Sequence, residues 1–263
     1  MMKNFWTQSE KNVYVAAHRG FSEKYPENTM PAFRAAIELG VDQIETDVRI
    51  TKDGELVLIH DAYVDRTSNG KGVVHDMTYA ELLELDFGSW KGEEFKGEKV
   101  VTLREFMELV KDLPDITLDL ELKEYPYPGW EEVSYSVADR VLEMVDEYGF
   151  TDRIVINSFS GKLNERIYEK YGKKYRQHVF YPISSLIHEM KLNPYYYAYC
   201  ACMFTDEKND YIYMKNSGVR CWGGASIKNA ETLDAAIERG VELVTVNNPD
   251  VILTLLRERG LHK

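Results

Sequence analysis

Ionisable side chains recur in this chain at the points where apolar runs end. Two histidines, three carboxylates and two cations lie at or just beyond the ends of four such runs. This pattern is typical of an active site assembled from several strand ends, because the carboxyl ends of parallel barrel strands carry the catalytic groups. The set comprises His18, Arg19, Glu45, Asp47, His60, Glu121 and Lys123.

The three carboxylates have the spacing of a divalent metal site. Glu45 and Asp47 are two residues apart on a predicted strand, so their side chains share one face. Glu121 ends the next predicted barrel strand with the same inward orientation. Converging carboxylates repel one another unless a cation lies between them, and Mg²⁺ and Ca²⁺ both take oxygen ligands. We therefore predict one divalent cation, Mg²⁺ or Ca²⁺, although each acid taken alone could equally be a surface charge.

The two histidines in the set are suited to general acid and base catalysis. Imidazole titrates closest to neutral pH, and His18 and His60 both flank the predicted acid cluster. A lone histidine at a strand end is more often a hydrogen-bonded core residue. The histidines without such neighbours are therefore given no role, and they are His75, His178, His188 and His262.

Arg19 and Lys123 are the cations of the predicted site. A guanidinium fork and an ammonium point charge both bind an anionic oxygen. Either could instead neutralise the carboxylates in a salt bridge, and the two roles are compatible. Tyr125 follows Lys123 on the predicted active face, in an aromatic cluster that extends to Trp130 and could wall a substrate pocket.

The elements that must position these residues alternate between extended and helical periods, which is typical of a parallel α/β protein. Thr29, Pro31 and Gly40 mark the start and the end of the first helix. Eight predicted strands and a length of 263 residues fit a (β/α)8 TIM barrel in a single domain, residues 1–263. The strands are expected at 13–17, 42–48, 116–122, 153–157, 175–180, 197–204, 219–222 and 242–246, with helices at 131–148, 161–171, 207–217, 229–239 and 250–259 among them.

Two features add to a plain barrel. The run 56–60 follows strand two after a connection too short for a parallel crossover, so we predict an antiparallel β-hairpin. A turn centred just before Gly54 would pair Asp47 with His60 across this hairpin. Residues 62–101 fit no βα repeat, and they are predicted to form a small insertion on the active-site side.

Composition limits the classes of partner. A formal net charge of -12 argues against nucleic acid, because binding to its backbone needs clustered Lys and Arg. It does not argue against a phosphate held by a metal and local cations. The sequence shows neither a signal-peptide pattern nor a run long enough for stable membrane insertion, so a cytoplasmic protein is predicted. Cys200, Cys202 and Cys221 are expected to be reduced core residues, and the possibility of a homo-oligomer is left open.

Six short motifs together resemble those of the glycerophosphodiester phosphodiesterase family. The resemblance runs from about residue 13 to residue 250, and the insertion segment shares it. The motifs, in order, are His18-Arg19-Gly20, Pro26-Glu27-Asn28-Thr29, Glu45-Thr46-Asp47-Val48, Lys52-Asp53-Gly54, His60-Asp61 and Glu121-Leu122-Lys123.

The resemblance implies metal-dependent hydrolysis of a small glycerophosphodiester to glycerol 3-phosphate and an alcohol. In the family's chemistry, the neighbouring glycerol hydroxyl attacks in line to give a cyclic phosphate, which water then opens. The implied roles are acid and base for His18 and His60, metal ligands for Glu45, Asp47 and Glu121, and phosphate binding for Arg19 and Lys123.

The carboxyl-terminal third departs from the family pattern. Where the family commonly has Trp-Thr-Val-Asn, this chain has Trp222-Gly223-Gly224-Ala225, and the family's Thr-Asp-x-Pro reads Val246-Asn247-Asn248-Pro249. The resemblance implies that strand seven contributes to the substrate end of the pocket and places Trp222 there, so the changes bear on the preferred head group.

Two alternative functions stay open beside the leading one. A related barrel phospholipase acting on intact phospholipid would favour secretion and an exposed apolar or basic rim, and the sequence shows neither. A non-catalytic barrel that binds a phosphorylated ligand would favour loss of a histidine or of a metal carboxylate, and all of these are retained.

Overall fold

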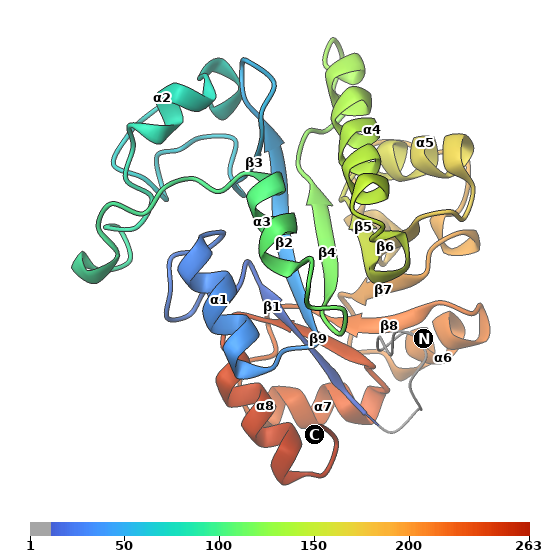
Figure 1. Cartoon of the computed structure of the whole chain (residues 1–263). Coiled ribbons are helices and arrows are strands. Elements are labelled where there is room, and N and C mark those ends of the chain that lie inside the picture. Colours follow the sequence, from blue (N-terminus) through green and yellow to red (C-terminus); the bar gives the residue numbers. More distant parts are fainter. Residues whose placement is uncertain (1–11) are drawn as a thin grey trace.

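Eight parallel strands form a closed barrel surrounded by helices in the computed structural model, which describes residues 12–263 (Figure 1). β1 pairs with both β2 and β9, and this closes the sheet, so the predicted TIM barrel is confirmed. The strands are β1 (Tyr14–His18), β2 (Gln43–Ile50), β3 (Leu56–Leu58), β4 (Thr117–Leu122), β5 (Ile154–Asn157), β6 (Arg176–Tyr181), β7 (Cys200–Met203), β8 (Arg220–Gly223) and β9 (Leu243–Val246), of which β3 lies outside the barrel.

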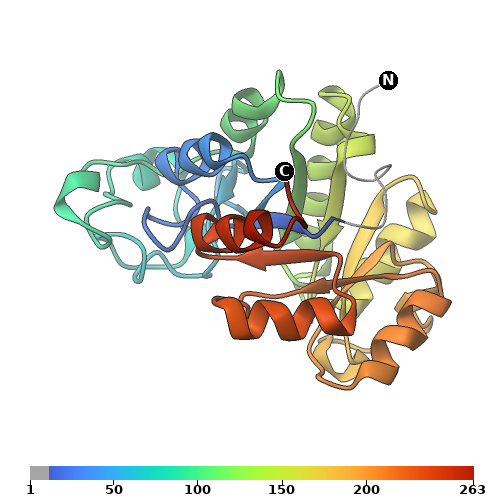
Figure 2. The same ribbon diagram turned by 90° about the horizontal axis from the view of Figure 1, so that it is seen from below.

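An α-helix lies between successive barrel strands except between β6 and β7, where the chain forms only short 3-10 turns, and the helices cover the outside of the sheet (Figures 1 and 2). The first helix has Thr29 as its N-cap and Pro31 in its first turn, and it ends at Gly40, whose φ of 78° is left-handed. The helices are α1 (Met30–Leu39), α2 (Tyr79–Leu83), α3 (Leu103–Val110), α4 (Glu131–Glu147), α5 (Gly161–Tyr171), α6 (Lys208–Asn216), α7 (Ala230–Arg239) and α8 (Pro249–Glu258). Within residues 12–263, no helix combines the length and the apolar character needed to cross a bilayer.

Apolar side chains fill both the barrel and the space around it. The larger core lies between strands and helices, where Phe33 of α1 packs against Phe106 of α3 with 4.6 Å between ring centroids. The three cysteines are free and buried, as predicted. A smaller cluster belongs to the barrel strands and comprises Tyr14, Ala16, Val155, Cys200, Trp222 and Leu243. Because a barrel of this type is packed inside, space for a ligand is left at the carboxyl ends of the strands.

The predicted hairpin is present, but its register differs from the expected one by a single residue. β2 and β3 are antiparallel, and Val48 pairs with Leu58. Asp47 therefore lies opposite Ile59, whose backbone N–H donates to the Asp47 carbonyl at 3.1 Å, and not opposite His60. The predicted direct pairing of Asp47 with His60 is wrong.

The turn explains this shift. The N–H of Thr51 donates to the carbonyl of Glu55 at 2.9 Å, so the loop holds three residues and is centred on Asp53. Gly54 has a φ of 91°, and three-residue hairpin loops commonly end with glycine in this left-handed region. A two-residue turn, which the sequence motif suggests, would have given the predicted register.

The insertion, residues 62–101, projects to one side of the barrel in both views (Figures 1 and 2). Alternate residues of β3 and the position after it face opposite ways: Leu56 and Leu58 join the main core, whereas Val57 and Ile59 join an apolar cluster of the insertion. The insertion therefore has a small core of its own, anchored on the strand that leads to the predicted catalytic His60.

Candidate active site

The carboxyl ends of the barrel strands enclose a cavity of about 430 Å³, and six of the seven predicted site residues line it. The seventh, Asp47, is fully buried and contacts Arg19 and Lys123 at 3.2 Å each. The lining residues are His18, Arg19, Glu45, His60, Asp119, Glu121, Lys123, Asn157, Phe159, His178, Phe180, Cys202, Phe204, Gly224, Ala225, Ser226 and Thr245.

The three predicted metal carboxylates converge. β2 and β4 pair in parallel with Asp47 beside Glu121, so the inward faces of the two strands present their acids together. One carboxylate oxygen from each of Glu45, Asp47 and Glu121 lies within 4.8 Å of the others, and all three residues are buried. Three buried oxygen donors are the kind of ligand set that a hard divalent cation takes.

The electrostatics of this triad also suit a cation. Burial raises the pKa of Glu45 well above its usual value, and the charges of Asp47 and Glu121 raise it further. Burial likewise raises the pKa of Glu121, although Lys123 opposes the change. Glu45 Oε1 is buried without a hydrogen-bond partner among the described residues, which costs free energy unless another group binds there. The residues present therefore fit a divalent metal ion.

Asn28 holds one member of the triad in place. Its Nδ2 donates to Asp47 Oδ2 at 2.8 Å, and its Oδ1 accepts from Thr46 Oγ1 at 2.8 Å. Asn28 does so with a φ of 57°, a region that asparagine enters more readily than most residues. The sequence identifies Asn28 only as part of a family motif, because the backbone conformation that aims its amide at Asp47 is visible only in the structure.

Both predicted cations form salt bridges with acids of the site. The sequence leaves this role open for them in addition to phosphate binding. Lys123 contacts Glu121 and Asp47, while Arg19 contacts Asp47 and Glu27. Burial works against the charge on Lys123, but the adjacent carboxylates outweigh it and raise the pKa of the ammonium. Burial raises the pKa of Asp47, but Lys123 and Arg19 outweigh that effect and hold it below its usual range.

The two histidines have different partners on Nδ1. His18 Nδ1 lies 2.6 Å from Oδ1 of the amide of Asn247, whereas His60 Nδ1 lies 2.6 Å from a carboxylate oxygen of Asp61. An acceptor on Nδ1 keeps the proton of a neutral imidazole there and leaves Nε2 as a lone pair. His18 Nε2 lies 3.8 Å from Glu45 Oε2, so this nitrogen is beside the acid triad.

Burial lowers the pKa of both imidazoles. The pKa of His18 falls to about 4, because burial and the adjacent Arg19 disfavour its charged form. The pKa of His60 is lowered by burial and by Lys123 and Arg19, while the charge of Asp47 partly offsets the change. Both rings are therefore neutral near pH 7 before a substrate anion enters.

A charged network joins the site to the insertion. Arg66 donates to Glu27 Oε2 and to Asp61 Oδ2, each at 2.7 Å. Glu27 also accepts from Arg19 at 2.8 Å, and Asp61 is the carboxylate beside His60. Arg66 of the insertion thus contacts both Glu27, which binds Arg19, and Asp61, which lies beside His60.

Two residues predicted for the substrate pocket are not among those that line the cavity. The Tyr125 hydroxyl lies 3.4 Å from Glu121 Oε1, and its ring packs edge-on against Tyr127. Trp222 is 1% exposed and packs against His178, with 4.9 Å between ring centroids. The position of Trp222 differs from the expected one because inward side chains deeper in a barrel fill the interior of the barrel and do not face the cavity at the carboxyl ends of the strands.

Sequence reasoning missed an aromatic wall of the cavity. The rings of Phe159 and Phe180 stack at 3.6 Å between centroids, and those of Phe180 and Phe204 lie nearly parallel at 5.5 Å. These residues lie at or just beyond the ends of β5, β6 and β7, so the rule that identified the acids could also have found them. The cavity therefore offers a substrate an apolar surface beside its charged groups.

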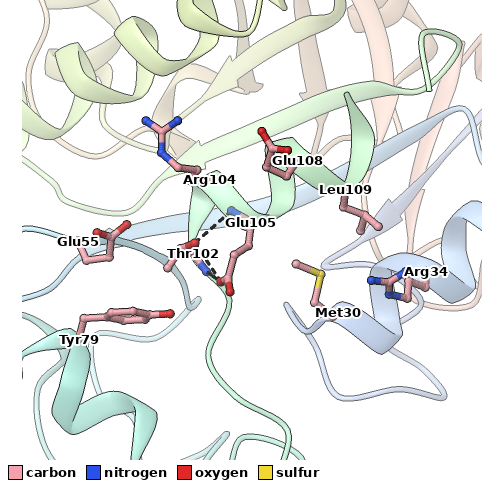
Figure 3. A pocket seen from close by; sticks show the side chains of 9 residues that line it. All are labelled: Met30, Arg34, Glu55, Tyr79, Thr102, Arg104, Glu105, Glu108 and Leu109. Atoms are coloured by element: carbon pink, nitrogen blue, oxygen red, sulfur yellow. Dashed lines mark hydrogen bonds between the residues drawn. The ribbon is translucent and has the colours of Figure 1, made fainter. Parts of the chain in front are cut away.

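A second hollow, of about 730 Å³, lies outside the barrel, among α1, α2 and α3 (Figure 3). None of the predicted site residues lines it. Its Glu105 carboxylate accepts hydrogen bonds from the backbone N–H and the hydroxyl of Thr102, which is a capping box at the start of α3. This acid stabilises a helix end, and we assign the hollow no chemistry.

The cavity brings two cations, two histidines and carboxylates to one place. Hydrolysis of a phosphoric diester needs groups of these kinds, which stabilise negative charge and transfer protons. Comparison with known proteins identifies the family: the model of the glycerophosphoryl diester phosphodiesterase family matches residues 18–258, and the chain belongs to this family.

Individual relatives are similar to this protein in sequence or in structure over nearly the whole chain. A glycerophosphodiester phosphodiesterase from Caldanaerobacter subterraneus subsp. tengcongensis is 34% identical over 255 residues, which cover 94% of this chain and 98% of the relative. A solved structure of an Oleispira antarctica phosphodiesterase, in complex with the product sn-glycerol-3-phosphate, has a TM-score of 0.76 and 25% identity, covering 93% of this chain and 96% of that chain. A glycerophosphodiester phosphodiesterase from Agrobacterium tumefaciens shares the fold, with a TM-score of 0.73 at 24% identity, covering 91% and 98%.

Proposed function

We propose that this protein hydrolyses glycerophosphodiesters to glycerol 3-phosphate and an alcohol, with Mg²⁺ or Ca²⁺ at the acid triad. The observation that carries the proposal is that His18 and His60, with unlike Nδ1 partners, line one cavity with two acids of the triad and both cations. Family membership supports the reaction class, and the Oleispira relative holds glycerol 3-phosphate as its product.

Glu45, Asp47 and Glu121 would hold the metal ion. A divalent ion, when bound, polarises a phosphoryl oxygen and lowers the pKa of a hydroxyl that it contacts. Arg19 and Lys123 offset the negative charge on the remaining phosphate oxygens, which grows in the transition state.

The Nδ1 partners suggest which histidine is the base. Asn247 is an uncharged acceptor, so it orients His18 without strongly favouring the imidazolium, and Nε2 is free to accept a proton. Asp61 carries a charge that stabilises a protonated His60, and a phosphate anion bound nearby stabilises it further. We therefore assign His18 as the general base and His60 as the general acid of the first step.

The proposed reaction balances in two steps, which start from neutral His18 and from a His60 that takes up a proton from solvent when the phosphate anion binds. The glycerol 2-hydroxyl attacks phosphorus and gives its proton to His18, while the bond from phosphorus to the alcohol oxygen breaks and His60 protonates that oxygen. Water then opens the cyclic phosphate and gives a proton to His60, while His18 returns its proton to the 2-oxygen. The products are the alcohol and glycerol 3-phosphate, and both histidines regain their starting states.

Release of glycerol 3-phosphate from a panel of glycerophosphodiesters, each with EDTA, Mg²⁺ or Ca²⁺, tests this function. We expect release with at least one of the two ions and none with EDTA. If folded, ion-bound protein releases nothing from any diester, the proposal fails. Cleavage confined to vesicles of intact phospholipid would support the phospholipase alternative instead.

Asn28→Gly should lower activity about 10- to 100-fold, the usual effect of removing a group that orients a metal ligand. Glycine adopts the positive φ of this position without strain, so the change removes only the side-chain amide, which donates to Asp47 and accepts from Thr46. The measurement is kcat/KM across a titration of Mg²⁺ and Ca²⁺. Asn193→Gly, which removes a side-chain acceptor for the N–H of Tyr195 away from the cavity, is the matched control. Full activity of Asn28→Gly at every ion concentration would show that this contact is dispensable.

A further inference from the structure

The cavity also contains polar groups that the proposed reaction does not use. His178 of β6 is 4% exposed, and its Nδ1 lies 2.7 Å from Oδ2 of Asp119 on β4. Its ring packs against Trp222 of β8. Side chains from alternate strands form one layer of a barrel interior, so His178, Asp119 and Trp222 lie in one layer beneath the loops.

Several atoms around this layer have no hydrogen-bond partner among residues 12–263. They are buried, and the residues that carry them all line the cavity. A buried polar atom without a partner costs free energy, so a group of them at one cavity points to a ligand that completes their hydrogen bonds. The atoms are His178 Nε2, Asp119 Oδ1, Asn157 Oδ1 and Thr245 Oγ1.

The chemistry of these atoms defines what they would bind. The Asp119 carboxylate accepts a hydrogen bond from Nδ1–H of His178, and in that tautomer of a neutral imidazole Nε2 is an acceptor. The free oxygens of Asp119 and Asn157 are also acceptors, and the Thr245 hydroxyl both donates and accepts. Because acceptors outnumber donors in this group, it fits a ligand that supplies O–H donors and carries no negative charge. An alcohol hydroxyl has both properties.

The position of this group relative to the acid triad indicates which alcohol. Asp119 precedes the triad member Glu121 by two residues on β4, and Asn157 is the strand neighbour of both Glu121 and His178. A short chain extending from a phosphate at Lys123 would bring a hydroxyl to this group. Glycerol has such a hydroxyl on its terminal carbon, beyond the one that attacks phosphorus.

We propose that Asp119, Asn157, His178 and Thr245 form a subsite for the terminal hydroxyl of the glycerol moiety. This inference rests on the proposed function, and it identifies the residues that would make the enzyme selective for the glycerol moiety of its substrate. His178 determines specificity in it, because its Nε2 accepts a hydrogen bond from the hydroxyl while Asp119 fixes the ring. The subsite makes the enzyme selective for glycerol over diols that lack this hydroxyl.

The test compares two phosphocholine diesters, one of glycerol and one of propane-1,2-diol, which keeps the attacking hydroxyl and lacks the terminal one. We expect the wild-type enzyme to prefer the glycerol diester about 10- to 100-fold in kcat/KM, because a site built to bind a hydroxyl discriminates against its absence. His178→Phe should reduce this preference to about threefold or less. The ratio for a single preparation is the readout, so a merely structural loss, which lowers both rates alike, would leave it unchanged.

Two further variants keep the test decisive. Asp119→Leu with His178→Phe removes both partners, so neither is left buried and unpaired if the single variant folds poorly. His262→Phe removes a similar contact, from His262 Nε2 to Asp42 Oδ2 at 2.9 Å, which does not involve the cavity, and it should keep the wild-type preference.

Three results would count against particular claims. Equal wild-type rates on the two diesters, or a wild-type preference in folded His178→Phe, would overturn the subsite and leave the proposed reaction standing. Hydrolysis of neither diester by the wild-type enzyme, with metal bound, would count against the proposed function itself.

Discussion

His60→Ala is expected to lower kcat/KM for glycerophosphocholine about 10²- to 10⁴-fold, the usual contribution of a positioned proton-transfer group. The same variant should lose less than about tenfold on a glycerol phosphodiester whose leaving group is p-nitrophenol. A phenolate of low basicity departs without a proton, so the general acid matters little for it. His18→Ala should impair both substrates strongly, because the attacking hydroxyl must lose its proton in either case.

The control for this comparison is His75→Ala. His75 packs against Trp130 with 4.6 Å between ring centroids and does not line the cavity, so both rates should stay near wild type. Calorimetric titration with Mg²⁺ or Ca²⁺ should show that His60→Ala still binds metal. Equal losses on the two substrates would remove His60 from the acid role, and near-normal activity on glycerophosphocholine would end the acid and base assignment.

Glu45→Gln is expected to weaken Mg²⁺ and Ca²⁺ binding more than about 100-fold and to reduce turnover in parallel, because it removes a charged metal ligand. The raised pKa of Glu45 adds a pH dependence. The metal-free site binds a proton more tightly than a free carboxyl does, and metal binding must displace that proton. Metal affinity should therefore increase with pH over the range in which Glu45 titrates.

Titration calorimetry in buffers of different ionisation enthalpy measures this displaced proton. The wild-type protein should release protons on binding metal, and Glu45→Gln should release fewer. Glu108→Gln, a change in the second hollow (Figure 3), is the matched control and should behave as wild type. If Glu45→Gln lost metal binding but kept its turnover, the proposed metal dependence would be wrong.

The barrel and most of the candidate site could be predicted because both obey local rules. Alternating apolar positions identify strands, and the end of a parallel strand identifies the side of the barrel on which Glu45, His60 and Lys123 lie. The structure brings these residues to one cavity. The hairpin register could not be predicted in the same way, because the local motif fits a loop of two residues as well as the three-residue loop that the hydrogen bond between Thr51 and Glu55 closes.

Long-range contacts between side chains account for the rest. His178 has no local feature that distinguishes it from a core histidine, and its partner Asp119 is 59 positions away on a strand that it does not adjoin. Whether Trp222 faces the cavity or the packed interior depends on its depth within the barrel, which strand periodicity does not specify. The contact of Asn28 with Asp47 depends on a positive φ at Asn28 that the motif alone does not reveal.

Arg66 connects the proposed catalytic groups to a segment that lies outside the barrel. The insertion that carries it has its own small apolar core, and segments of this kind can open locally while the remainder of a protein stays folded. Opening would withdraw one guanidinium from Glu27 and Asp61 together, so Arg19 and His60 would lose support in the same event. We therefore expect the folding of this segment to set the fraction of molecules in which Arg19 and His60 are held in place, and low denaturant to reduce activity before the barrel unfolds.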